Sequence, residues 1–99
     1  MISAIDVISA LTDQLKEVGK TLKSTERVRI FYAGDFQPMQ AFQITPHGDR
    51  FLYIRGQLNG TGREIIAPAN RCSFMFAVSP RLPDEPPEAR VVLGFAKDK

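Results

Sequence analysis

The sequence has few residues that could stabilise a fold by covalent cross-links, since it contains a single cysteine. Its 99 residues include one cysteine, so no disulfide can form within the chain, and a lone thiol fits a reducing compartment. Hydrophobic residues make up 43% of the chain and charged residues 24%, which is ordinary for a soluble domain. We therefore expect a single domain spanning residues 1–99, with a core that needs no cofactor or metal.

Long apolar runs and a strong excess of one charge are also missing. No stretch approaches the roughly 20 apolar residues of a membrane span. The N-terminus has no basic region, and Asp6 interrupts its apolar stretch, so it does not match a signal peptide. The formal net charge is only +2, whereas strong nucleic-acid binders are usually far more basic. The sequence predicts a cytoplasmic protein with no membrane partner and with nucleic acid as a less favoured partner than protein.

Residues that commonly carry catalysis are few and scattered. His47, the only histidine, lies in Pro46-His47-Gly48, which is typical of an exposed turn. Cys72 is expected on the buried side of a strand, where a thiol is not activated. Gly60-Thr61-Gly62-Arg63 leads into a strand rather than a helix, which indicates a hairpin and not a phosphate loop.

The acidic cluster near the C-terminus has an equally simple interpretation. Asp84, Glu85 and Glu88 lie among prolines in residues 80–88, which predicts an exposed, extended loop rather than a catalytic cleft. The sequence thus predicts no catalytic residue and no set of metal ligands, and we expect the protein not to be an enzyme.

Residues 3–22 have the periodicity of an amphipathic helix. Ser3 followed by Asp6 predicts a capping box at its start. Apolar side chains recur every three or four residues and form one stripe, namely Ile2, Ile5, Ile8, Leu11, Leu15, Val18 and Leu22.

From Glu26 onward the period changes to two, which is typical of strands. The alternation and the intervening turn residues predict strands at 27–33, 39–45, 50–58, 63–67, 71–79 and 90–96. We expect an α+β fold, with the N-terminal helix packed on an antiparallel meander of five to six strands that is strongly curved or barrel-like. The helix stripe should pack on Val28, Ile30, Phe42, Ile44, Leu52, Ile54, Phe74 and Phe76.

The strand positions that point away from the helix form the candidate binding surface. Met39 and Ala41 are also expected to point away from the helix. The candidate binding residues are Arg27, Arg29, Phe31, Phe51, Tyr53, Arg55 and Met75. Aromatic residues, methionine and arginine are enriched in protein interfaces. The sequence therefore predicts a small non-catalytic protein-binding or adaptor module that self-associates through this face, most simply as a homodimer, or binds another protein.

Other occupants of the same face remain open. Bases can stack on aromatic rings while arginines hold phosphates, so a single-stranded nucleic-acid binder of small-barrel type is the first alternative. Leu52-Tyr53-Ile54-Arg55-Gly56 resembles the short second motif of Sm-like RNA-binding barrels, whose first motif is not recognisable in this chain. A small-ligand-binding domain is the second alternative.

Overall fold

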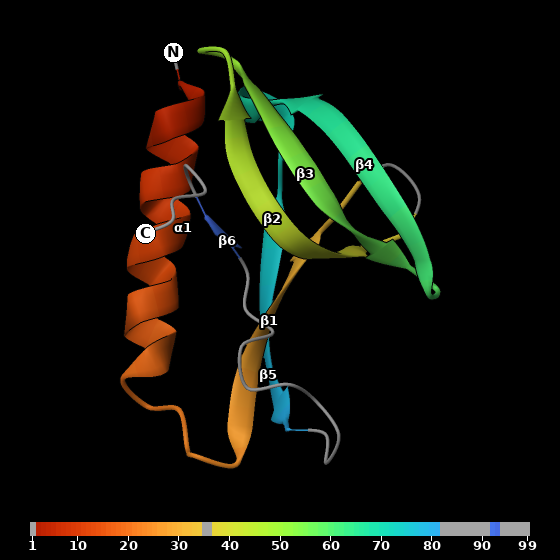
Figure 1. The fold of residues 1–99 in the computed structure, drawn as a ribbon. Helices are drawn as coiled ribbons and strands as arrows, with labels where there is room; N and C mark the ends of the chain where they lie inside the picture. The colour runs from red at the N-terminus through yellow and green to blue at the C-terminus, as the bar shows by residue number, and fades with distance from the viewer. Residues whose placement is uncertain (1, 35–36, 82–91, 94–99) are drawn as a thin grey trace.

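The computed structural model describes residues 2–34, 37–81 and 92–93, and it contains one long helix and a sheet (Figure 1). The elements in chain order are α1 (Ala4–Gly19), β1 (Glu26–Tyr32), β2 (Met39–His47), β3 (Phe51–Leu58), β4 (Thr61–Pro68), the 3₁₀ helix η1 (Ala69–Arg71), β5 (Phe74–Pro80) and β6 (Val92–Leu93).

The start of α1 is fixed by the predicted capping box. The Ser3 hydroxyl accepts a 3.1 Å hydrogen bond from the Asp6 backbone N–H, and the Ser3 backbone N–H donates a 3.1 Å bond to the Asp6 carboxylate. Two donors that the first turn would leave without partners are thereby satisfied. The helix ends at Gly19, three residues before the expected boundary at residue 22.

The buried stripe of α1 is narrower than the sequence predicted. Ala4, Ile8 and Leu11 are buried, but Ile2 and Ile5 are 52% and 56% exposed. Successive helical residues are about 100° apart around the axis, so burying Ala4 turns Ile5 toward solvent. The expectation that both isoleucines contribute to the core is wrong.

The sheet has the strand order β4-β3-β2-β1-β5, and these five strands are antiparallel. The predicted α+β class is confirmed. The first four strands form a meander, and β5 then returns to pair with β1. A closed barrel requires its edge strands to meet, whereas β4 and β5 lie at opposite ends of this order. The sheet is not closed or strongly curled, so the strongly curved or barrel-like expectation is wrong.

Strand β2 changes partners along its length. Its first residues pair with β1, with Ile30 opposite Ala41. Its second half pairs in parallel with β6, with Ile44 opposite Leu93. Figure 1 shows β6 between β2 and α1, while the β1–β5 ladder extends away from the other strands.

A bulge marks the point where β2 changes partners. The pairing with β3 shifts register between Ala41 and Gln43, which leaves Phe42 as the extra residue. Because one extra residue reverses the alternation, Met39 and Ala41 face the core together with Ile44 and are 2% and 0% exposed. The expectation that Met39 and Ala41 point away from the helix is therefore wrong.

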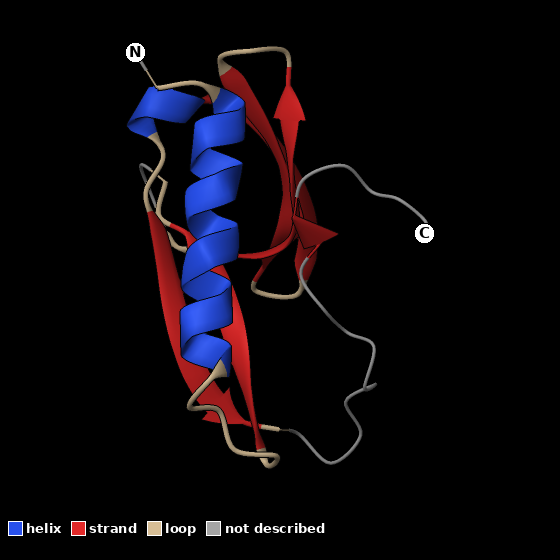
Figure 2. Cartoon of the chain, turned by 90° about the vertical axis from the view of Figure 1, so that its left-hand side faces the viewer, coloured by secondary structure: helices blue, strands red, loops and turns tan. Residues whose placement is uncertain are grey.

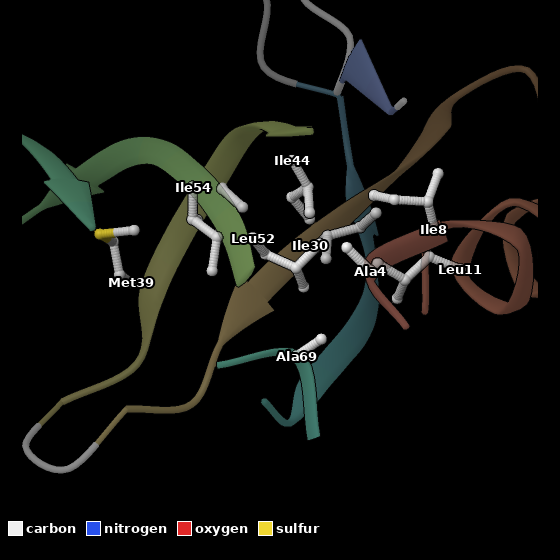
Figure 3. Close-up of a cluster of buried hydrophobic side chains, with 10 residues drawn as sticks. Ala4, Ile8, Leu11, Ile30, Met39, Ile44, Leu52, Ile54 and Ala69 are labelled. Carbon is white, nitrogen blue, oxygen red and sulfur yellow. The ribbon is translucent and has the colours of Figure 1, made fainter. Parts of the chain in front are cut away.

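The core lies between α1 and the sheet face toward it (Figure 3). The side chains that are fully buried at its centre are Ile30, Ile44, Leu52 and Ile54. All four were expected to contact the helix stripe. Phe74 and Phe76 are only partly buried and pack at its margin, as does the Tyr32 ring, whose centroid is 5.7 Å from that of Phe74.

The turns and strand boundaries agree with the sequence in part. Asn59 and Gly60 have positive φ values of 54° and 80° and join Leu58 to Thr61, which confirms the predicted hairpin. Arg71 lies in η1, and β5 begins at Phe74 rather than at residue 71. Of the predicted strand 90–96, only Val92–Leu93 lies within the described residues, and the loop acids Asp84, Glu85 and Glu88 lie outside them.

Candidate functional site

The candidate surface is the sheet face opposite α1, which we call the open face. Along β3, Phe51, Tyr53 and Arg55 alternate with the buried Leu52 and Ile54, so their side chains point away from the helix. Figure 2 shows α1 lying over one side of the sheet. The open face is therefore the side that α1 does not cover.

Four of the predicted residues lie together on β1 and β5. Phe31 is directly opposite Met75, whose side chain is 47% exposed. Arg29 lies two residues before Phe31 on β1, and its guanidinium donates a 3.0 Å hydrogen bond from Nε to the hydroxyl of Ser79. Arg27 is the cross-strand neighbour of Ser79. This half of the open face combines an apolar pair with two arginines that follow one another along β1.

The remaining three predicted residues lie on β3. Phe51 is 43% exposed at the start of the strand, and Tyr53 and Arg55 are the next residues with the same orientation. Arg55 donates a 3.2 Å hydrogen bond from Nε to the side-chain carbonyl of Gln43. This bond joins Arg55 to its cross-strand neighbour on β2.

Strand β2 separates these two groups with polar side chains. Gln40 lies opposite Phe31 on one side and opposite Gln57 on the other, and the two amides are joined by a 3.3 Å hydrogen bond. Since adjacent strands are about 4.8 Å apart, β1 and β3 are about 10 Å apart. The structure thus places all seven predicted residues on one face but in two clusters rather than in one continuous patch.

The sequence interpretation missed two members of this face, Ile66 and Glu64 on β4. Ile66 is 54% exposed and lies opposite Tyr53, and Glu64 lies opposite Arg55. A signal for both was present, because a two-residue Asn-Gly turn fixes the register of its hairpin. Counting outward from Leu58 and Thr61 places Ile66 across from Tyr53.

Glu64 adds a negative charge to the middle of the β3–β4 half. Partial burial, and then the hydrogen bond that the Tyr53 hydroxyl donates to the Glu64 carboxylate, raise the pKa of Tyr53 above its ordinary value of 10.0. The phenol therefore stays neutral at physiological pH. In this part of the open face, the Tyr53 ring, the Glu64 carboxylate and the Arg55 guanidinium lie within two neighbouring cross-strand pairs, Tyr53–Ile66 and Arg55–Glu64.

The structure describes the surroundings of both His47 and Cys72, and Cys72 follows η1 rather than lying in the strand expected from residue 71. His47 is exposed at the end of β2. Cys72 is partly buried against the core, and its Sγ lies 3.1 Å from the carbonyl oxygen of Pro68. Burial raises the pKa of the Cys72 thiol, which disfavours the reactive thiolate.

Two further features bear on other kinds of site. Among residues 2–34, 37–81 and 92–93, no three His, Cys, Asp or Glu side chains gather closely enough to hold a metal ion. Across the same residues, no helix has the length and apolar character of a membrane span.

A hollow of about 350 Å³ opens on the helix side of the sheet, beyond the end that α1 covers. Tyr32, Met39, Leu58 and Ile65 supply most of its apolar lining, with Arg63 and Glu64 at its polar part. Of the open-face residues, Glu64 borders it, and none of the seven predicted binding residues lines it.

Comparison of the chain with family models, with curated proteins and with solved structures finds no match.

Proposed function

We propose that this chain is a small non-catalytic protein-binding module that associates with a second copy of itself, with the open face contributing to the contact. The observation that carries the proposal is the exposure of large apolar side chains on that face: Met75 is 47%, Phe51 43% and Ile66 54% exposed. Exposed apolar patches on small soluble domains usually mark interaction sites.

The energetics favour a dimer that depends on concentration. Burying Phe31, Phe51, Tyr53 and Met75 contributes at most roughly 6–12 kcal/mol, at about 1.5–3 kcal/mol for each side chain. Association costs about 4–15 kcal/mol in lost freedom of motion. Because the two ranges overlap, we expect reversible self-association rather than a permanent dimer.

Single-stranded nucleic acid is the second candidate, since aromatic and arginine side chains alternate on β3 as Tyr53 and Arg55. Two contacts make it less favoured. The Arg55 guanidinium donates to Gln43, and Glu64 brings a carboxylate beside Tyr53, where it would repel a phosphate. The formal net charge of +2 is also modest for a nucleic-acid binder.

The double variant Phe51→Glu/Met75→Glu tests the proposed self-association. Both side chains are exposed in a single chain, so the two carboxylates should leave the monomer folded. They place like charges in any contact that uses the open face, and we expect a monomer where the wild type dimerises. Sedimentation velocity measures the masses, and circular dichroism with a melting curve confirms the fold.

A matched control carries the same change in charge elsewhere. Ile5→Glu/Gln14→Glu alters two exposed positions on α1, away from the open face, and should dimerise like the wild type. A double variant that still dimerises would contradict the proposal. A salt-dependent anisotropy change of a labelled single-stranded oligonucleotide, lost in Tyr53→Ala, would favour the nucleic-acid candidate instead.

A further inference from the structure

Strand β5 is the last strand at one end of the sheet that the structure describes. Within the described residues, β5 pairs with β1 alone. The flanking bonds Ala33 N–H to Ser73 O and Arg81 N–H to Thr25 O show that the odd-numbered residues of β5 exchange hydrogen bonds with β1. Antiparallel ladders alternate, so the even-numbered residues Phe74, Phe76 and Val78 direct their N–H and C=O groups away from β1.

No charged side chain of β5 protects this edge, and its proline, Pro80, is the last residue of the strand. Edge strands of soluble proteins are commonly protected by charged residues. The opposite edge strand, β4, follows this rule with Arg63 and Glu64, whereas β5 has the sequence FMFAVSP and carries no charge. Met75 is 47% exposed on the open face, and Val78 is 50% exposed on the helix side. Both surfaces of β5 are therefore apolar next to a row of hydrogen-bonding groups.

We propose that β5 of a second copy adds to this edge in antiparallel orientation, about a two-fold axis at Phe76. This inference rests on the proposed self-association and places the contact at the β5 edge, beside Met75, rather than over Phe51 and Ile66 on β3 and β4. In that register Phe76 faces the partner's Phe76, and Phe74 faces the partner's Val78. All three outward N–H groups of each strand find a carbonyl of the other strand, and Pro80, which has no N–H, lies beyond the paired residues.

The side-chain rows of the two sheets also match in this register. On the helix side, Val78 has Val28 of its own chain on one side and the partner's Phe74 on the other, and the partner's Tyr32 lies beyond that phenylalanine. This apolar row covers the exposed Val78. On the open face, Met75 lies beside the partner's Ala77, so no like charges stand directly opposite one another. A second copy therefore satisfies both the backbone and the side chains of this edge.

Two lysine variants distinguish edge pairing from a face-to-face contact. Val78→Lys and Ile66→Lys change side chains that are 50% and 54% exposed, and each lies on an edge strand. Val78 is on the helix side of β5, whereas Ile66 is on the open face of β4. Edge pairing predicts that Val78→Lys raises the dimer dissociation constant by at least about tenfold and that Ile66→Lys leaves it within about twofold.

The opposite result, with Ile66→Lys monomeric and Val78→Lys dimeric, would overturn edge pairing and retain the proposed self-association through the open face. A monomeric wild type would overturn both. A wild-type mass above that of a dimer would overturn the two-fold register, because a two-fold contact is complete with two copies. Such a mass would instead indicate head-to-tail pairing, in which β5 of one copy pairs with β4 of the next and further copies can be added.

Hydrogen exchange tests the register in the unmodified protein. At concentrations where the dimer predominates, the amides of Phe76 and Val78 should exchange as slowly as the amide of Ala77, which is bonded to β1. On dilution, protection of Phe76 and Val78 should fall while that of Ala77 persists. Fast exchange of the Phe76 and Val78 amides in the dimer would overturn the proposal. Because this experiment uses the wild-type protein, its result does not depend on whether the lysine variants fold.

Discussion

At the scale of single residues, one glycine allows β2 and β3 to approach each other closely. Gly56 lies opposite Ala41 at the β2 bulge, and a Cβ built on it would stand 1.9 Å from the backbone oxygen of Gln40. Backbone, unlike a flexible side chain, cannot easily move away. The bulge directs Met39 and Ala41 into the core, and β2 comes this close to β3 opposite a residue that has no Cβ.

We predict that Gly56→Ala lowers the free energy of unfolding by about 1–3 kcal/mol, the usual cost of overpacking a core. Gly62→Ala is the matched control on β4, because a Cβ added there would meet nothing within 4 Å beyond its chain neighbours. The control should stay within about 0.5 kcal/mol of the wild type. Urea denaturation followed by circular dichroism gives both values. Equal stabilities of the two variants would contradict the close approach at the bulge.

The same bulge explains where sequence interpretation failed at this scale. Phe42 and Ile44 continue an apparent alternation, so nothing local distinguishes a regular strand from one with an extra residue. The buried Ile30, Leu52 and Ile54 were assigned correctly because their strands are regular. Ile66 was missed although the Asn59-Gly60 turn fixed its register opposite Tyr53.

At the scale of elements, α1 is the cover of the sheet, and its stripe is short. Ala4, Ile8 and Leu11 reach the core, while Leu15 and Val18 are only partly buried. The existence and start of the helix followed from the sequence, because periodicity and capping are local properties. Its exact face did not, since a rotation of one residue about the axis is decided by packing against β2.

Leu11→Asp tests the importance of this cover. Leu11 is 6% exposed, so a carboxylate there would lie among Ile30 and Ile44, and we expect a loss of several kcal/mol that unfolds much of the protein. Ala10→Asp places the same side chain on the exposed face of α1 and should cost less than about 1 kcal/mol. Thermal melts of both variants make the comparison, and a wild-type melt for Leu11→Asp would refute the packing of α1.

At the scale of the whole molecule, long-range pairing decided what the sequence left open. The α+β class followed from one helix and six short alternating segments. The placement of β5 beside β1, and the open form of the sheet, depend on contacts between residues far apart in the chain, such as Phe31 with Met75. No local pattern encodes such a pairing. The same pairing divides the candidate surface into two clusters separated by Gln40 and leaves β5 at an edge.

The central claim is that two copies of this chain associate, and sedimentation equilibrium of the wild-type protein tests it most directly. From micromolar to millimolar concentrations, the weight-average mass should rise reversibly from the 11.1 kDa of one chain toward twice that value. A mass that stays at 11.1 kDa up to the highest concentration would contradict the account.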